Sequence, residues 1–365
     1  MRPLADPDFW RDRAVLLTGH TGFKGAWLTL WLQALGARVS GLADGPAPAL
    51  SLYELTRAGD GVGEWHADVR DHAAVRAAFA ASAPEIVIHM AAQALVRRSY
   101  ADPRGTYETN VMGTVNVLEA VRCTPSVRAF VNVTSDKCYA NAPSRPPRPF
   151  VEDDRLGGHD PYSSSKACAE FVVDAYRSSF FAAGGDGPRA GSARAGNVIG
   201  GGDWGEDRLI ADFMRGALAG EPIRVRHPDA VRPWQHVLNP LSGYLRLAEA
   251  LHAAPGCEGG WNFGPAPGDA RPVRWIADRI AGLWSDELRW EIDPGPHPPE
   301  AAYLALSSAK AREQLRWEPV WDIAEALRRT VAWYRALHDG EDMRAVTLDQ
   351  IGAFEAAGAP VRSRA

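Results

Sequence analysis

Five side chains in two short strings have the types and spacing that redox and elimination chemistry requires. Ser135, Asp136 and Lys137 are consecutive and supply a hydroxyl, an acid and an amine. Tyr162 and Lys166 follow as a Tyr-x-x-x-Lys pair. If the fold brings both strings beside one cofactor, these groups suffice to oxidise a sugar, eliminate water from it and reduce it again.

Tyr162 and Lys166 lie four residues apart, which places both side chains on one face of a helix. A phenol has an ordinary pKa of about 10 and is a poor base at neutral pH. A nearby ammonium group and the positive nicotinamide ring of an oxidised dinucleotide lower that pKa. We therefore predict that Tyr162 takes the proton from a sugar hydroxyl while the sugar carbon gives a hydride to NAD.

A glycine-rich loop at residues 19–25 reads Gly-His-Thr-Gly-Phe-Lys-Gly. It follows an apolar run of strand length and precedes an apolar helical stretch, where a pyrophosphate can approach the backbone at the helix N-terminus. We predict that this loop binds the cofactor through Gly19, Thr21, Gly22, Phe23, Lys24 and Gly25.

Residues after later strands complete the predicted cofactor site, namely Asp68, Val69, Ala91, Ala92 and Gln93. Asp68 is expected to bond the adenine amino group, and the small residues let a ribose or nicotinamide pass close to the backbone. The acid that usually holds the adenosine ribose lies at the end of the second strand. Asp44 comes one residue late, and no arginine replaces it for a 2′-phosphate, so NAD is favoured over NADP.

Apolar runs of strand length alternate with helical patterns, which is typical of a parallel sheet covered by helices. The expected strands are 14–18, 39–42, 86–89, 129–134, 193–198 and 261–263. The expected helices are 26–35, 107–122, 163–181 and 239–251, with Ser163 as a cap of the third.

The predicted fold is α/β, a Rossmann-type doubly wound parallel sheet with a smaller C-terminal substrate-binding lobe. We predict an NAD-binding domain at 1–200 plus 236–264, a nucleotide-sugar lobe at 201–235 plus 265–345, and a C-terminal tail at 346–365. A substrate is expected between the lobes, outside the carboxyl ends of the strands.

Composition narrows the class of protein. The chain has 365 residues, 46% of them hydrophobic, and a net charge of −5, which argues against nucleic-acid or membrane-surface binding. The first thirteen residues contain no apolar signal segment, so a cytoplasmic protein is expected. The four cysteines lack metal or disulfide spacing and are expected to be reduced thiols, and no metal site is predicted.

The glycine loop with its downstream Tyr-x-x-x-Lys resembles the extended short-chain dehydrogenase/reductase family. Further strings are similar to the CDP-glucose 4,6-dehydratase branch of that family: Thr-Ser-Asp-Lys-Cys-Tyr at 134–139, Asp-Pro-Tyr-Ser at 160–163, Arg-Ala-Gly-Asn-Val-Ile-Gly-Gly-Gly-Asp-Trp at 194–204 and Arg-Pro-Trp-Gln-His-Val at 232–237. The resemblance spans residues 14 to about 330 and implies NAD-dependent dehydration of CDP-glucose to CDP-4-keto-6-deoxyglucose.

The resemblance also implies roles for the first string. Relatives commonly have Thr-Asp-Glu there, where the acid protonates the departing O6 hydroxyl and the glutamate removes the C5 proton. Ser135 is then expected to bond O4 and a protonated Asp136 to act as the acid. Lys137 either becomes neutral and removes the C5 proton, which needs a pKa well below about 10.4, or stays charged and stabilises the enolate while water or another group takes the proton.

Four more residues resemble family positions near the substrate: Asn110, Asn197, Arg208 and Arg232. Asn110 resembles a helix asparagine that supports the active-site backbone. The other three resemble residues facing the nucleotide diphosphate, where arginine suits phosphate oxygens. The family further implies a homodimer formed through the helices at 107–122 and 163–181.

Three alternatives stay open. A nucleotide-sugar 4-epimerase shares the oxidation at C4 but needs no acid and base for elimination, so Asp136 and Lys137 distinguish the two activities. A dehydratase for another nucleotide sugar would differ only in the pocket for the base. A non-catalytic NAD-binding relative would keep the fold, but nothing would then require both catalytic strings.

Overall fold

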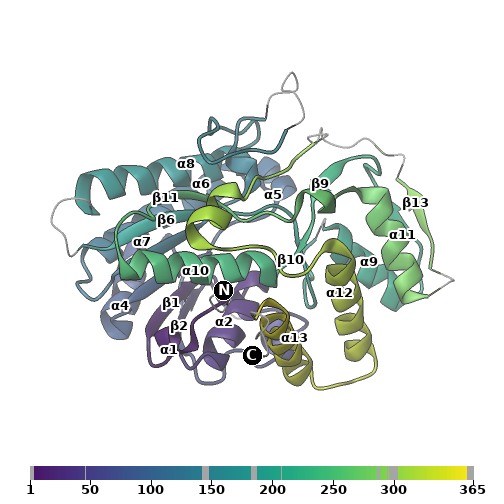
Figure 1. The fold of residues 1–365 in the computed structure, drawn as a ribbon, viewed down its shortest axis with the longest axis horizontal. Coiled ribbons are helices and arrows are strands. Elements are labelled where there is room, and N and C mark those ends of the chain that lie inside the picture. The colour runs from purple at the N-terminus through teal and green to yellow at the C-terminus, as the bar shows by residue number, and fades with distance from the viewer. Residues whose placement is uncertain are drawn as a thin grey trace, which may run out of the picture.

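The computed structural model describes residues 4–45, 47–141, 148–181, 187–206, 208–285, 288–293, 295 and 303–359. A seven-stranded, fully parallel sheet forms its centre, with helices on both faces (Figure 1). The strand order is β11-β6-β5-β4-β1-β2-β3. The predicted Rossmann-type doubly wound fold is therefore confirmed.

The strands of this sheet are short, and the central strands β1, β4 and β5 are mostly apolar and fully buried, because helices cover both faces of the sheet. Their bounds are β1 Ala14–Thr18, β2 Arg38–Ala43, β3 Gly63–His66, β4 Ile86–His89, β5 Ala129–Val133, β6 Arg189–Arg194 and β11 Gly259–Asn262. Alternate residues of β1 enter different cores. Val15 and Leu17 pack on one side with Trp27 and Trp31, whereas Leu16 packs on the other side with Phe79.

Most of the longer helices pack around this sheet. The α-helices are α1 Pro7–Trp10, α2 Phe23–Ala34, α3 Leu52–Leu55, α4 His72–Ser82, α5 Val96–Ala101, α6 Pro103–Tyr107, α7 Gly113–Arg122, α8 Pro161–Tyr176, α9 Leu209–Ala219, α10 Leu238–Ala253, α11 Val273–Trp284, α12 Ile323–His338 and α13 Met343–Gly358. Residues of α4, α7 and α8 form one core, and residues of α2, α10 and α13 contribute to the other. Within the described ranges, no helix combines the length and apolarity that a membrane crossing needs.

Shorter elements complete the fold. Three two-stranded sheets pair β7 Val198–Ile199 with β10 Gln235–His236, β9 Val231–Pro233 with β12 Ala270–Pro272, and β8 Ile223–Val225 with β13 Trp290–Ile292. Single helical turns form η1 Glu108–Met112, η2 Asp136–Cys138, η3 Arg177–Phe181, η4 Pro267–Asp269 and η5 Ala311–Leu315. The predicted domain boundaries at 200, 236 and 264 stay a prediction. One hydrophobic core contains residues of both the predicted NAD-binding domain and the predicted nucleotide-sugar lobe.

The structure corrects two local predictions around the site. Ser163 does not cap α8, because the Asp160 side chain accepts the Ser163 N–H at 2.9 Å and is itself the cap. The predicted strand 193–198 is two separate strands, β6 and β7, which belong to different sheets. The segment at 195–197 that joins them contains Asn197, one of the predicted site residues.

Most of the predicted C-terminal tail at 346–365 is helical in the described residues, because residues 343–358 form α13. This helix lies against α2 (Figure 1), where Trp31 Nε1 donates to Glu355 at 2.7 Å and Phe354 packs edge-on to both Trp31 and Trp321. Its inward-facing residues make it part of the core. Residues 360–365 lie outside the described residues.

Candidate active site

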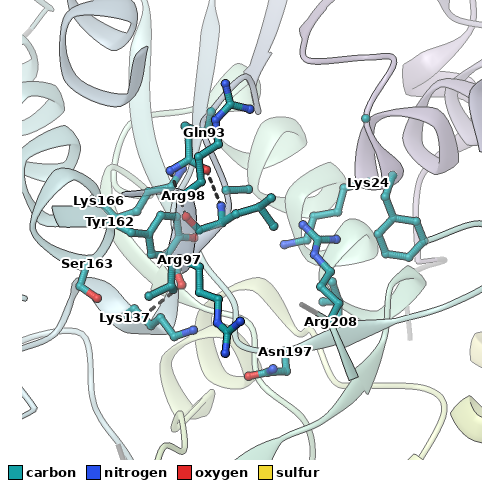
Figure 2. A pocket seen from close by; sticks show the side chains of 18 of the residues that line it. Lys24, Gln93, Arg97, Arg98, Lys137, Tyr162, Ser163, Lys166, Asn197 and Arg208 are labelled. Carbon is teal, nitrogen blue, oxygen red and sulfur yellow. Dashed lines mark hydrogen bonds between the residues drawn. The ribbon is translucent and has the colours of Figure 1, made fainter. Parts of the chain in front are cut away.

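A cleft of about 1090 Å³ opens at the carboxyl ends of the central strands. It is lined by the glycine loop after β1, by segments after β4, β5 and β6, and by residues of α8 and α9. Figure 2 shows Lys24, Gln93, Lys137, Tyr162, Lys166, Asn197 and Arg208 around it. Every predicted site residue except Asn110 lines this cleft.

The glycine loop has the form that a dinucleotide needs. Gly19 has φ +73°, and a Cβ on Gly25 would lie 2.1 Å from the Gly19 carbonyl oxygen. The loop therefore folds tightly against the start of α2. Gly22 precedes that helix without a side-chain cap, so the first N–H groups of α2 are available to a pyrophosphate. These features fit NAD.

The adenosine end of the cleft contains Asp44, Asp68 and Arg70. Arg70 donates to Asp68 from its backbone N–H at 2.8 Å and from its guanidinium at 2.6 Å, and these bonds lower the pKa of the Asp68 carboxyl. Asp68 is two residues beyond β3, and Asp44 directly follows β2. Both acids therefore lie on the wall where an adenosine would lie.

The Tyr-x-x-x-Lys pair lies on the first turns of α8, with both side chains buried. Burial raises the pKa of Tyr162 to about 12, although a hydrogen bond with Ser135 opposes this. Burial lowers the pKa of Lys166 to about 8, although Glu170 opposes this. The Lys166 amine donates to the Val133 carbonyl at 3.3 Å, which ties α8 to the end of β5.

Ser135, Asp136 and Lys137 follow β5, in and just before the turn η2. The Ser135 hydroxyl donates to Asp136 Oδ1 at 3.0 Å and accepts the Lys137 N–H at 3.2 Å. Asp136 is 2% exposed, and its Oδ2 has no hydrogen-bond partner in the described part of the chain. Burial raises the pKa of this carboxyl, against the opposing charge of Lys137. A carboxyl kept protonated in this way suits a general acid.

Lys137 and Tyr162 come from different elements but face the same space. The Lys137 amine lies 6.0 Å from the centre of the Tyr162 ring. Lys137 is half-buried, whereas Lys166 is buried. The fold therefore brings the two predicted strings together in the cleft, as their chemistry requires.

The predicted substrate residues divide into two groups. Asn197, Arg208 and Arg232 line the cleft, and the Arg208 guanidinium donates to both Asp203 oxygens at 2.9 Å. Asn110 lies behind the wall and does not line the cleft. Its side chain accepts the Gln93 N–H at 2.8 Å and donates to the Gln93 carbonyl at 3.0 Å and to Ser165 at 2.8 Å. Its grouping with the substrate-binding residues is corrected to a support of the backbone.

Several cations that line the cleft were not predicted as substrate contacts, among them Arg97, Arg98 and Lys24. Arg97 and Arg98, on α5, extend into the cleft (Figure 2). The Lys24 amine also enters it and donates to the Tyr244 hydroxyl at 3.4 Å. Burial lowers the pKa of Lys24 to about 8. The Arg-Arg string after the fourth strand was the signal available in the sequence, since ligands bind beyond strand ends.

A doubly wound sheet with a pyrophosphate loop and a buried Tyr-Lys pair in one cleft defines a dinucleotide-dependent enzyme that oxidises a hydroxyl group. A family model agrees: that of the NAD dependent epimerase/dehydratase family matches residues 15–258. The chain belongs to this family.

Individual relatives are similar over nearly the whole chain. The CDP-glucose 4,6-dehydratase of Salmonella typhimurium (strain LT2) is 46% identical, over 97% of this chain and 99% of its own length. The UDP-glucose 4-epimerase of Mycolicibacterium smegmatis is 29% identical over 88% and 98%. The crystal structure of the Thermus thermophilus UDP-glucose 4-epimerase complex with NAD superimposes with a TM-score of 0.75 at 28% identity, over 88% of this chain and 98% of that one.

Proposed function

We propose that this protein is a CDP-glucose 4,6-dehydratase, which uses NAD to convert CDP-glucose to CDP-4-keto-6-deoxyglucose. The 46% identity to the Salmonella typhimurium dehydratase over 97% of the chain supports the reaction and the nucleotide. The observation that carries the chemistry is the meeting of Asp136, Lys137 and Tyr162 in one cleft. An epimerase would need only the last of these.

Oxidation at C4 comes first. Ser135 holds the O4 hydroxyl, and Tyr162 removes its proton with the help of the Lys166 ammonium. NAD held by the glycine loop at 19–25 would supply the redox chemistry, namely removal of the C4 hydride and its return to C6. Because the oxidised sugar carries a carbonyl at C4, its C5 proton becomes acidic and elimination becomes possible.

Elimination of water is assigned to the second string. Asp136 gives its proton to the departing O6 hydroxyl, which leaves as water. Lys137 either takes the C5 proton as a neutral amine, or stabilises the enolate as an ammonium while water or another group takes the proton. Asn197, Arg208 and Arg232 bind the nucleotide diphosphate, supported by their positions along the cleft.

Incubation with CDP-, UDP-, GDP- and dTDP-glucose in separate reactions tests the proposal. Mass spectrometry should show loss of one water from CDP-glucose alone. Loss from another nucleotide sugar would keep the chemistry and change the substrate. No loss from any of the four, with NAD added, would reject the dehydratase and favour the epimerase.

Two variants in deuterated water distinguish the roles of the elimination residues. Asp136→Asn should still oxidise C4 and exchange the C5 proton with solvent, but release no water. Lys137→Met should lose the exchange if Lys137 is the base. If Lys137 only stabilises the enolate, exchange should persist at a reduced rate. Tyr162→Phe is the matched control, because it should prevent formation of NADH itself.

We also propose a homodimer, supported by large apolar side chains on adjacent helices. Met112, Phe171 and Phe180 are 51%, 57% and 52% exposed on η1, α8 and η3. Such side chains gathered on one pair of helices indicate a protein contact. Sedimentation should give twice the chain mass for the native protein and the chain mass for Met112→Glu/Phe171→Glu. A native monomer would reject this proposal.

A cytoplasmic location is proposed as well. All four cysteines, Cys123, Cys138, Cys168 and Cys257, are free thiols in the structure, as expected in a reducing compartment. Cell fractionation with a tagged chain should recover the protein with cytoplasmic markers. Recovery with an extracytoplasmic fraction would contradict the proposal.

A further inference from the structure

A buried ion pair lies behind the Tyr-Lys pair. The Arg194 guanidinium donates to both oxygens of Glu170 at 2.9 Å, and the two side chains are 6% and 4% exposed. Glu170 is four residues beyond Lys166 on α8, so Tyr162, Lys166 and Glu170 follow one face of that helix. Arg194 is the last residue of β6.

Glu170 also reaches the other catalytic string. The Thr134 hydroxyl donates to Glu170 Oε1 at 2.5 Å. Thr134 immediately precedes Ser135, and its backbone continues from β5 into the turn that contains Asp136. One carboxylate therefore connects the helix of the oxidation residues with the segment of the elimination residues.

The Arg194 guanidinium occupies a tightly enclosed space. A Cβ on Gly260 of the neighbouring strand would lie 2.4 Å from an Arg194 nitrogen, so only glycine leaves room for the guanidinium. Arg194 also donates to the Tyr139 hydroxyl at 2.8 Å and to the Glu152 carbonyl at 2.9 Å. Because its donors are so fully used, the arginine fixes the position of the Glu170 carboxylate.

Several ionisable groups lie near Lys166. Glu170 of α8 and Cys138 of η2 act to raise its pKa, and its own charge acts on Lys24 of α2 and His89 of β4. Tyr162 lies one turn earlier on α8, Asp136 shares η2 with Cys138, and Arg194 of β6 pairs with Glu170. Burial raises the pKa of Tyr162, Cys138 and Asp136 and lowers that of His89 to about 3, so these groups favour their uncharged forms. Lys24 adds a positive charge when it is protonated. Among the groups named, Glu170 is the acid that is held in a buried ion pair, with Arg194 at 2.9 Å.

We propose that Glu170 is a positioning residue for the oxidation step, which keeps Lys166 charged and aligned beneath Tyr162. The inference rests on the proposed function and extends it by a residue outside the cleft lining. Without the carboxylate, a desolvated ammonium would lose its proton more easily, because Glu170 raises the pKa of Lys166 against burial. Tyr162 would then lack the cation that makes it a base.

The test compares Glu170→Gln with the native enzyme on CDP-glucose across pH. The variant should lose roughly tenfold in kcat near pH 8 while its KM changes less than about threefold, and the alkaline fall of kcat should begin roughly one pH unit lower. Substrate deuterated at C4 should react with a larger isotope effect on kcat, because hydride transfer becomes slower than elimination.

Two controls keep the outcome decisive. Glu170→Gln leaves Arg194 without its partner and can destabilise the fold, so Glu170→Gln/Arg194→Met removes both charges together. The double variant should show the same shift of the alkaline limb and the same isotope effect. Glu249→Gln, which alters another buried glutamate far from the cleft, should show neither.

The results separate this inference from the proposed function. A native enzyme that does not dehydrate CDP-glucose would reject the proposed function. A native enzyme that does, together with variants whose pH profile and isotope effect match it, would reject the role of Glu170. A uniform loss of rate at every pH without a larger isotope effect would show a structural role alone and would reject it as well.

Discussion

Gly196 and Asp136 lie directly against each other in the cleft. A Cβ at position 196 would be 2.8 Å from Asp136 Oδ2 and 2.6 Å from the Cγ of Pro233. Gly196 follows β6 by two residues, whereas Asp136 follows β5 by three. The absence of a side chain on one strand end therefore leaves the space that the proposed acid occupies on the next.

Gly196→Ala should impair elimination more than oxidation. The added methyl group must displace the Asp136 carboxyl or Pro233, and a shift of about 1 Å in a catalytic group can cost roughly 100-fold in rate. We expect dehydration to fall by at least about tenfold, while NADH still forms on addition of substrate. Equal loss of both steps would show that the methyl group disturbs the cofactor site instead.

We expect Lys166 to set an alkaline limit on catalysis. Because its pKa is lowered to about 8, the ammonium is present below that pH and is lost as the pH rises through it. The rate of C4 oxidation should therefore fall above about pH 8. Lys166→Arg keeps its charge over this range and should remove the fall, whereas Lys166→Met should lose roughly 100-fold at all pH values. An unchanged fall in the arginine variant would assign the limit to another group.

Alanine substitutions at Gly22 and Gly25 of the pyrophosphate loop should have different effects. A Cβ on Gly25 would collide with Gly19 and His20 backbone atoms, whereas a Cβ on Gly22 would lie 3.4 Å from the Gly19 carbonyl oxygen. Gly25→Ala should therefore destabilise the fold by about 2 kcal/mol or more. Gly22→Ala should fold normally but bind NAD at least about tenfold more weakly. Urea unfolding and NAD titration measure the two effects separately.

Helix α13 should contribute strongly to stability. Phe354 is fully buried between Trp31 and Trp321, so Phe354→Ala should lower the free energy of unfolding by about 3–5 kcal/mol. Leu50→Ala, at a side chain 61% exposed, should change it by less than about 0.5 kcal/mol. Denaturant titrations compare the two. A small effect at Phe354 would mean that α13 detaches easily from α2.

Many features of the fold and of the candidate site can be predicted from the sequence, because the sequence patterns that indicate them are local. The spacing of Tyr162 and Lys166 places them on one helix face, and the glycines at 19, 22 and 25 need only their neighbouring strand and helix. The alternation of apolar runs and helical patterns likewise predicts the parallel sheet. In each case the residues that define the feature are close together in the chain.

Other features depend on contacts between distant segments, which a single sequence does not reveal. The position of Asn110 behind Gln93, the pairing of Glu170 with Arg194 and the packing of α13 on α2 arise only when the chain folds.

The protonation of the site residues also depends on contacts between distant segments. Burial shifts the pKa of Asp136 and Lys166, and burial is the sum of everything that packs around a side chain. The sequence therefore predicts which groups carry the proposed chemistry. The groups that hold them in place and the directions in which their pKa values shift become visible only in the folded chain, because desolvation and charge pairing are properties of the assembled core.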